Sequence, residues 1–268
     1  MTGVRITASA VYAPGTAGDP PADQAHLLLG RKGLLFQEPA VRLALCAVHR
    51  ALGLPPGRTV APIDGAAGTA VVASSNFGNV QTVCNIVDQV RADDLRGVSP
   101  MQAPNASSNI VASSIAIRYG FTGPNLMICS GATGGLDALR AAALLIRGGR
   151  ATRAVVVGTE PDDAVAAALS GGTPAAACVV LEAAGPGPGP YVEMHPVRRD
   201  DRRETAEPGW LRFGGDESDD SGATGVLRTA RAARRLLDRP DARHALVTCG
   251  SAADGYAGVH LEVAGARP

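Results

Sequence analysis

One stretch of the chain has the residue pattern of a reactive elbow, in which a strand turns sharply into a helix. Residues 123–139 read as a strand, a tight turn and a helix. The unpaired N–H groups at such a helix start favour negative charge, which is how a cysteine there becomes a good nucleophile. The residue that this geometry would present is Ala132, which cannot react. The elbow thus has the frame for nucleophilic chemistry without the nucleophile.

The other polar side chains of the elbow are expected to be structural. Cys129 ends the strand and is predicted to be a buried thiol, since free cysteines are commonly buried. Ser130 and Thr133 are predicted to make turn and cap hydrogen bonds, because the sequence places no base beside them. An alternative stays open, in which Cys129 acts as a displaced nucleophile.

Metal ions and nucleotides are not favoured by any pattern in the sequence. The histidines lie on different predicted elements without ligand spacing; they are His26, His49, His195, His244 and His260. The glycines at 131, 134 and 135 lack the order of a dinucleotide fingerprint, and the acidic run 216–220 is typical of a solvated loop. We therefore predict no metal site and no cofactor.

The elbow and its flanks resemble the first half of a β-ketoacyl synthase. The resemblance is carried by residues 105–109 (NASSN), 115–125 (IAIRYGFTGPN) and 150–160 (RATRAVVVGTE), and it extends over most of residues 1–198. In that family the elbow carries the cysteine that accepts the growing acyl chain. The resemblance implies that Ala132 occupies the position of this cysteine.

The second part of the chain departs further from the family. Ketosynthases supply two histidines there, and the motif of the first is missing from this sequence. The second motif corresponds to residues 218–225, which puts Asp219 at the histidine position. A carboxylate cannot act as the neutral imidazole donor. Because losing a nucleophile alone costs on the order of a million-fold in rate, the resemblance implies no condensing activity of the usual kind.

The fold implied is α/β: a thiolase-like, layered αβαβα ketosynthase fold with an abbreviated second half. We expect a single domain over residues 1–268, with residues 1–184 as the first half and 191–268 as the shortened second half. The expected strands are 4–11, 69–74, the elbow strand with Cys129 at its end, 154–157, 175–182, 244–248 and 257–263, and the expected helices are 37–52, a segment around 83–90, 105–118, the elbow helix and 226–237.

The last of these helices has a clear apolar face and a clear charged face. We expect its core face to consist of Val226, Ala230, Ala233 and Leu237, and the arginines at 228, 231 and 235 to point outward. The preceding segment 198–207 is expected to be a mixed-charge loop.

Composition excludes several classes of partner. The 25 Lys and Arg residues equal the 25 Asp and Glu residues, which removes the electrostatic argument for nucleic acid or an anionic membrane surface. No apolar run reaches the roughly 20 residues that span a bilayer, and residues 1–30 lack a signal pattern. The five cysteines are widely spaced and are expected to be reduced, mostly core thiols. We expect a cytoplasmic protein.

Taken together, the resemblance implies a non-catalytic ketosynthase-like subunit. Bacterial type II polyketide synthases pair an active ketosynthase with an inactive look-alike, the chain length factor, and this sequence is similar to a truncated one. Such a subunit would form a heterodimer with the active ketosynthase, complete the tunnel for a polyketide or polyene chain, and receive substrate from an acyl carrier protein. The candidate tunnel or interface residues come from segments 76–90 and 99–114, and the larger ones are Phe77, Val83, Met101, Ile110 and Val111.

Two other functions stay open. The chain could be a stand-alone acyl-thioester enzyme that recruits Cys129 or Asp219, whose mark would be a thiol with a depressed pKa in a cleft. It could also be a structural homodimer.

Overall fold

The computed structural model describes residues 3–16, 18–170, 174–185, 191–195, 198–200, 205–214 and 221–265. These residues form one ten-stranded mixed sheet with the order β3-β2-β4-β5-β1-β6-β10-β9-β8, and β7 pairs with β10. The strands are β1 (Val4–Tyr12), β2 (Thr69–Ser74), β3 (Asn125–Ile128), β4 (Arg153–Glu160), β5 (Ala175–Ala183), β6 (Tyr191–Met194), β7 (Arg198–Asp200), β8 (Leu211–Phe213), β9 (His244–Ser251) and β10 (Gly255–Ala264).

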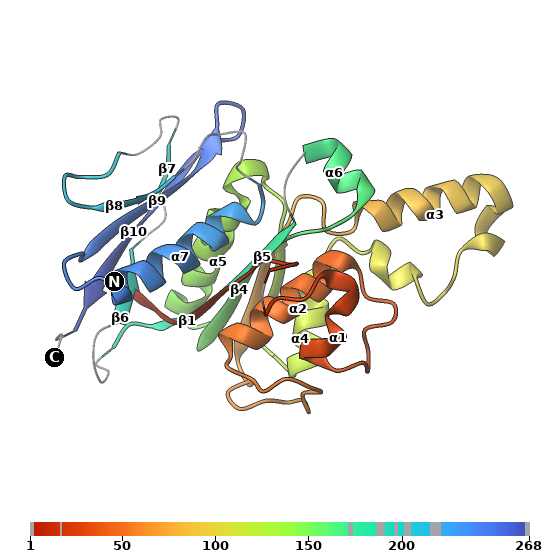
Figure 1. Ribbon diagram of the computed structural model, residues 1–268, viewed down its shortest axis with the longest axis horizontal. Coiled ribbons are helices and arrows are strands. Elements are labelled where there is room, and N and C mark those ends of the chain that lie inside the picture. Colours follow the sequence, from red (N-terminus) through yellow and green to blue (C-terminus); the bar gives the residue numbers. More distant parts are fainter. Residues whose placement is uncertain are drawn as a thin grey trace.

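The helices lie on both faces of this sheet (Figure 1). They are α1 (His26–Leu29), α2 (Pro39–Ala51), α3 (Val80–Asp93), α4 (Ile110–Tyr119), α5 (Gly134–Arg147), α6 (Ala164–Ser170) and α7 (Thr224–Asp238). Short 3-10 turns are η1 (Ala22–Gln24), η2 (Asp94–Gly97), η3 (Ala103–Ala106) and η4 (Gly131–Thr133). Every strand and helix core predicted from the sequence is present.

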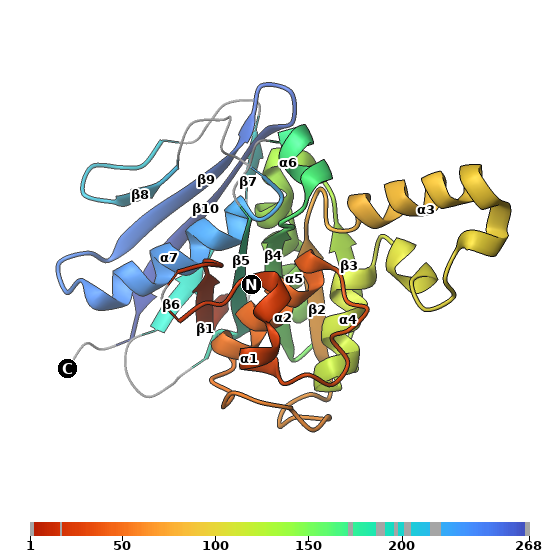
Figure 2. The same ribbon diagram turned by 45° about the vertical axis from the view of Figure 1, so that its right-hand side comes forward.

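The sheet separates two hydrophobic cores. On one face, α2 and α4 pack against β2, β4, β5 and β1. On the other face, α5 and α7 pack side by side, and α7 also contacts β9 and β10. The sheet therefore bends around α5 and α7, which gives the sequence of layers helix, sheet, helix, sheet (Figure 2). Among the described residues, the helices packed on β9 and β10 all lie on this inner side, so the fifth layer of a full αβαβα fold is not built there.

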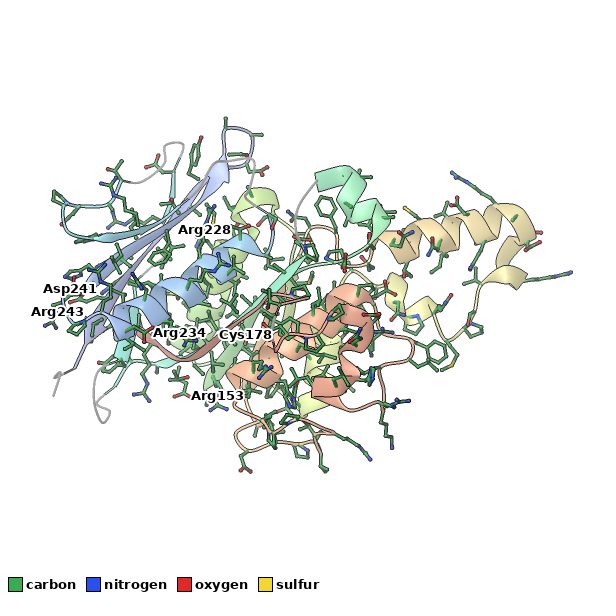
Figure 3. All side chains as sticks on the ribbon, in the orientation of Figure 1. Arg153, Cys178, Arg228, Arg234, Asp241 and Arg243 are labelled. Carbon is green, nitrogen blue, oxygen red and sulfur yellow. The ribbon has the colours of Figure 1, made fainter. Side chains whose placement is uncertain are left out.

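Small residues allow the central layers to approach closely. A Cβ added to Gly225 of α7 would lie 2.5 Å from the Leu136 nitrogen of α5, and one added to Gly135 would lie 2.8 Å from the Gly225 nitrogen. Cys178 on β5 is fully buried in the core on the other face of the sheet, with α2 and α4, whereas Arg234 of α7 lies at the periphery (Figure 3). The alanine-rich and glycine-rich composition is thus used where backbones cross.

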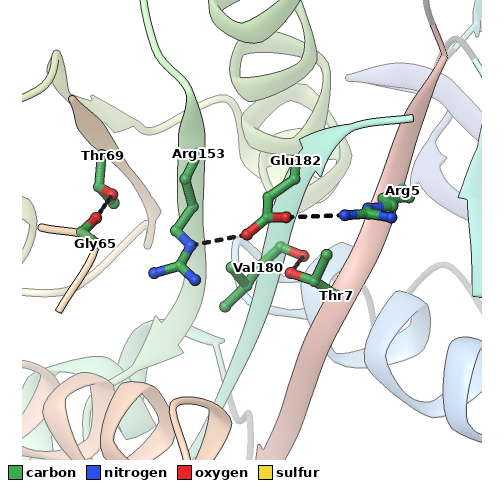
Figure 4. A network of polar contacts seen from close by, with 7 residues as sticks. All are labelled: Arg5, Thr7, Gly65, Thr69, Arg153, Val180 and Glu182. Carbon is green, nitrogen blue, oxygen red and sulfur yellow. Dashed lines mark hydrogen bonds and ion pairs between the residues drawn. The ribbon is translucent and has the colours of Figure 1, made fainter. Parts of the chain in front are cut away.

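A polar row crosses the sheet at right angles to its strands. Glu182 on β5 lies between Arg5 on β1 and Arg153 on β4, and its carboxylate pairs with both guanidinium groups at 3.4 and 3.1 Å (Figure 4). The three residues occupy directly opposed register positions. These ion pairs help to fix the register of the three strands. The alternation of apolar residues alone would leave that register to side-chain packing.

The structure corrects the predicted faces of α7. Leu236 is fully buried, while Leu237, the predicted core residue, is 52% exposed. Because α7 lies between β5 and β9, its buried face is wider than that of a helix on a single sheet. For the same reason Arg228 does not point outward: it donates to the Thr248 carbonyl of β9 at 2.8 Å.

Two other expectations were wrong in detail. The predicted loop 198–207 contains β7, which pairs with β10. The helix predicted to begin at residue 105 begins at Ile110, because the preceding residues 103–106 form the 3-10 turn η3, with Pro104 in its first turn.

One helix stands away from the body. Figures 1 and 2 both show α3 projecting outward as an arm, followed by η2. None of the side chains described in α3 is buried, although Val83 and Val87 lie along it and are 39% and 40% exposed. Within the described part of the chain, no helix is long and apolar enough to cross a membrane.

Candidate functional site

The elbow forms as the sequence predicts. β3 ends at Ile128, Gly131 adopts a φ of +65°, and η4 leads directly into α5 at Gly134. A left-handed φ is strained for a side chain with a Cβ, so glycine at 131 permits the sharp change of direction. The turn places the main-chain N–H groups of η4 at the end of the β3 edge of the sheet.

Hydrogen bonds from two hydroxyl groups fix the turn. Ser130 and Thr133 both donate to the same carboxylate oxygen of Asp137, at 2.6 and 2.7 Å. The two hydroxyls thus make turn-stabilising bonds as predicted from the sequence, but neither makes the predicted cap bond to a main-chain N–H group. Asp137 in the first turn of α5 also complements the helix dipole.

Ala132 is buried in the elbow, with 5% of its surface exposed. Its methyl group offers no lone pair or proton, so this position cannot attack a thioester. Its N–H group donates at 2.9 Å to Oδ2 of Asp254, which lies in the turn between β9 and β10. The carboxylate of Asp254, from the second part of the chain, therefore binds the main chain at Ala132.

A second carboxylate is buried behind the elbow. Glu160, at the end of β4, accepts hydrogen bonds from the Ser75 hydroxyl and from the N–H groups of Asn76 and Phe77, at 3.0–3.2 Å. Burial raises the pKa of Glu160, and these donors oppose the rise. Asn76 in turn donates to the Gly131 carbonyl at 3.2 Å, so the network ties the end of β2 to both the end of β4 and the elbow.

Cys129 differs from its predicted environment, because its side chain is exposed in this chain. The reason is that β3 is the outermost strand of the sheet and has a neighbour on one side only among the described strands. Burial around the sulfur raises the pKa of the Cys129 thiol, and the Glu160 carboxylate raises it further. The thiol is therefore poorly ionised, the opposite of what a displaced nucleophile requires.

The prediction that most cysteines are buried holds for three of the five. Cys46, Cys178 and Cys249 are buried and free, as expected, but Cys84 on α3 is exposed like Cys129. Cys84 lies on α3 and Cys129 directly follows β3, and the rest of this chain leaves both elements partly uncovered. No group of three or more His, Cys, Asp or Glu side chains in the described ranges is arranged to hold a metal ion.

The five tunnel or interface candidates fall into three environments. Val111, on α4, is 1% exposed and lies in the core. Ile110 and Phe77 are partly buried, and Val83 and Met101 are exposed. Asp219, the residue at the expected histidine position, lies outside the described residues.

A cavity of about 390 Å³ lies between the arm and the body. Its lining comes from α3, from the segment 35–38 and from the approach to η3, and includes Phe36, Thr82, Ile86 and Gln102. The tunnel residues were predicted from segments 76–90 and 99–114, and both segments contribute to this cavity. The five named candidates themselves are not among the lining residues.

Two site residues were not predicted from the sequence. Asp254 lies in an Asp-Gly turn between two strands, a pattern that predicts a hairpin but not its contact with Ala132. Glu160 ends an apolar strand, and its burial depends on three donors from a loop 85 residues earlier. A charged residue directly after a buried strand was the available signal.

Comparison with known proteins places this geometry in a family. The sequence pattern of "Beta-ketoacyl synthase, N-terminal domain" matches residues 4–170. No curated protein sequence matches the chain.

Solved structures share its fold. The chain is similar to "The ishigamide ketosynthase/chain length factor", with TM-score 0.72, 20% identity, and 98% of this chain and 100% of that chain covered. It is also similar to the type II polyketide synthase structure "AntDE:AntF (apo)", in which an acyl carrier protein is in complex with its ketosynthase, with TM-score 0.74, 14% identity, and coverage of 98% and 99%.

A ketosynthase in complex with its chain length factor from Xenorhabdus doucetiae matches with TM-score 0.59, 14% identity, and coverage of 97% and 99%. The fold is accordingly the thiolase-like ketosynthase fold with a short second half, as predicted. With its family pattern spanning β1 to α6 and the elbow at the expected place, the chain belongs to the β-ketoacyl synthase family.

Proposed function

We propose that this chain is a non-catalytic ketosynthase-like subunit, of the chain length factor type, that pairs with an active ketosynthase and shapes the tunnel for its acyl chain. The observation that carries the proposal is the buried methyl group of Ala132 at the elbow. The elbow keeps its turn, its hydroxyl bonds to Asp137 and its buried carboxylate network. Since the frame is kept and the reactive atom is lost, the structural role of the fold is what remains.

The edge strand supports pairing with a second ketosynthase-like chain. β3 is last in the sheet order, and its side chains are half-buried or exposed, with Leu126 at 38%. An exposed edge with apolar side chains is a template for another strand. A partner that continues the sheet beyond β3 would also cover Cys129.

The arm supports the same partner. Val83 and Val87 lie four residues apart on α3, on one helical face, and remain exposed together with Met101, which is 60% exposed. An apolar stripe on a helix that this chain leaves uncovered indicates contact with another protein. Because α3 and β3 are both uncovered, we propose one occupant for both, the active ketosynthase.

The proposed effect on chain length is steric. The cavity at the base of the arm lies between the two segments from which tunnel residues are proposed. An acyl chain extended into a closed space clashes when another methylene is added, and such overpacking costs about 1–3 kcal/mol. In this proposal the partner supplies the cysteine and histidines, and an acyl carrier protein delivers substrate to the pair in the cytoplasm, where free thiols such as these stay reduced.

Co-expression with a candidate ketosynthase tests the proposal. We expect the two chains to co-purify at a 1:1 ratio, measured by size-exclusion chromatography with light scattering, and the pair, but neither chain alone, to extend acyl thioesters. A homodimer that ignores the ketosynthase would contradict the proposal and favour the purely structural alternative. Consumption of acyl thioester by this chain alone would favour the enzyme alternative.

Product length tests the tunnel separately. Phe77→Ala and Met101→Ala in the reconstituted pair should give longer products by mass spectrometry, because each removes a side chain that is proposed to limit the space. Leu237→Ala on α7, also an exposed apolar residue, is the control and should leave product length unchanged. Unaltered length in both test variants would remove these two residues from the tunnel without affecting the pairing proposal.

A further inference from the structure

The elbow holds a carboxylate in place of a substrate. Asp254 Oδ2 accepts the hydrogen bond from the Ala132 N–H at 2.9 Å. A Cβ added to Gly131 would lie 2.3 Å from the same oxygen, so the close approach depends on glycine at 131. The carboxylate thus lies directly on the main chain of the elbow.

A short hairpin delivers this carboxylate. β9 and β10 are joined by a turn at residues 252–254, and Gly250 and Gly255, in the strands on either side of it, have φ values of +138° and +73°. The Asp254 N–H donates to the Ser251 hydroxyl at 3.1 Å, which fixes the turn just before the carboxylate. The hairpin packs against η4, so the position of Asp254 is set by elements on both sides of the contact.

The contact with Asp254 keeps the Ala132 N–H group from binding a substrate carbonyl. In acyl transfer, an N–H group at a turn of this kind polarises the carbonyl oxygen of the substrate and stabilises the oxyanion that develops. A neutral carbonyl oxygen is a weaker acceptor than a carboxylate, whose hydrogen bonds are roughly twice as strong. While Asp254 occupies the Ala132 N–H, a thioester carbonyl cannot take its place.

We propose that Asp254 is a built-in plug that closes the elbow of this chain to acyl thioesters, so that the loss of the nucleophile is only one of two independent blocks. The inference deepens the proposed non-catalytic role and rests on it. A thiol restored at position 132 would then face a filled acceptor position and a neighbouring negative charge. That charge opposes formation of the thiolate.

Restoring the thiol with and without the plug tests the proposal. The variants are Ala132→Cys, Ala132→Cys with Asp254→Asn, and Ala132→Cys with Asp254→Ala, all in a background with Cys84→Ser and Cys129→Ser, because those thiols are exposed. Each protein is incubated with an acyl N-acetylcysteamine thioester. The introduced thiolate would attack the thioester carbonyl, release N-acetylcysteamine as the thiol, and keep the acyl group in a new thioester bond. Intact mass and peptide mapping locate that group.

We expect the single variant to acylate slowly and each double variant to acylate at least about tenfold faster, in keeping with the large effect of a single oxyanion donor. The pH dependence of iodoacetamide alkylation should show a lower apparent pKa for the introduced thiol once Asp254 is replaced. Asp137→Asn with Ala132→Cys is the matched control, since Asp137 is a carboxylate of the same elbow that binds the hydroxyls of Ser130 and Thr133. It should not increase the rate of acylation.

Equal acylation rates with and without Asp254, in variants whose thermal unfolding shows that they are folded, would overturn the proposal. Asp254→Asn keeps the side-chain shape, so it reports on charge if Asp254→Ala disturbs the hairpin. Failure of the proposed function would appear differently, as acylation of the unmodified chain. The adduct at position 132 and the adduct elsewhere in the chain are distinguished by the peptide map.

Discussion

At the scale of single residues, the elbow is held by carboxylates whose burial is matched by donors. Glu160 is 7% exposed and accepts from Ser75, Asn76 and Phe77. Desolvation of such a group is costly unless its oxygens are bonded. The network is the reason why the loop after β2 lies against the elbow, and its removal should be felt in the stability of the whole chain.

Glu160→Ala should lower the free energy of unfolding by about 2–4 kcal/mol, because each buried donor left without an acceptor costs roughly 1–3 kcal/mol. Urea denaturation followed by circular dichroism measures the change. Glu182→Ala is the control: its carboxylate pairs with two arginines but is 26% exposed, and ion pairs of this kind contribute at most about 1 kcal/mol each. A loss no larger for Glu160 than for Glu182 would contradict the assignment.

Another residue-scale effect concerns the outer face of β9 and β10. His260 stacks on Trp210 at 4.2 Å between ring centroids, and its Nε2 lies 3.1 Å from Nδ1 of His244. Burial, together with electrostatic repulsion from His195 and His244, lowers the pKa of His260 to about 4, against an opposing effect of Glu262. The folded state therefore favours the neutral ring.

The sign of the pH effect follows from that shift. A histidine with a lowered folded pKa contributes stability that is complete above its unfolded pKa, near 6.5, and is lost as the pH falls from there toward about 4. His260→Gln should therefore flatten the decrease of unfolding free energy between pH 7 and pH 5. His26→Gln on α1, outside the stack, should leave that decrease as it is. Parallel slopes for the wild type and His260→Gln would show that the ring does not govern it.

At the scale of elements, the sequence predicted the positions of helices and strands better than the exposure of their side chains. Apolar periodicity gave α2, α5 and the strands of the first part of the chain to within a few residues, because each has one clear buried face or is buried throughout. It did not give the exposure of Cys129, since the sequence does not show that β3 is an edge strand. It also missed α1, β6, β7, β8 and α6, which have only three to seven residues each and are therefore too short for a period to be recognised.

The edge strand yields a prediction at the same scale. Leu126→Lys should reduce co-purification with the partner ketosynthase at least about tenfold, since a charge would be buried unpaired at the proposed interface. The stability of the isolated chain should change by less than about 0.5 kcal/mol, as for most exposed positions. Leu237→Lys, on a leucine of α7 that is also exposed, should leave pairing intact. Undiminished pairing by the Leu126 variant would move the interface away from β3.

At the scale of the whole molecule, α5 and α7 join the two parts of the chain. Their backbones approach at Gly135 and Gly225, and both helices pack against the common sheet. The resemblance to ketosynthases implied this layered arrangement, and the composition, rich in small residues, was consistent with it. The contact between Asp254 and Ala132 could not be inferred, because it joins two turns 122 residues apart.

The crossing is tight enough to test with one carbon atom. Gly225→Ala should lower the free energy of unfolding by about 1–3 kcal/mol, the usual cost of overpacking, because its Cβ would lie within 3 Å of the backbone of α5. Gly185→Ala, where a Cβ would meet no atom within 4 Å, should have little effect. Thermal unfolding by calorimetry compares the two. Similar melting temperatures for both variants would mean that the helices can move apart without loss.

The position of β1 has a consequence for how the protein is made. This strand comes first along the chain, yet it lies in the interior of the sheet, where Val4 pairs with both Ala183 and Met194. At a synthesis rate of roughly 5–20 residues per second, the ribosome completes those partners on the order of ten to forty seconds after β1. Until then β1 lacks its partner strands, and its apolar side chains stay exposed. Because of this topology, we expect the need for chaperones to depend on the timing of synthesis.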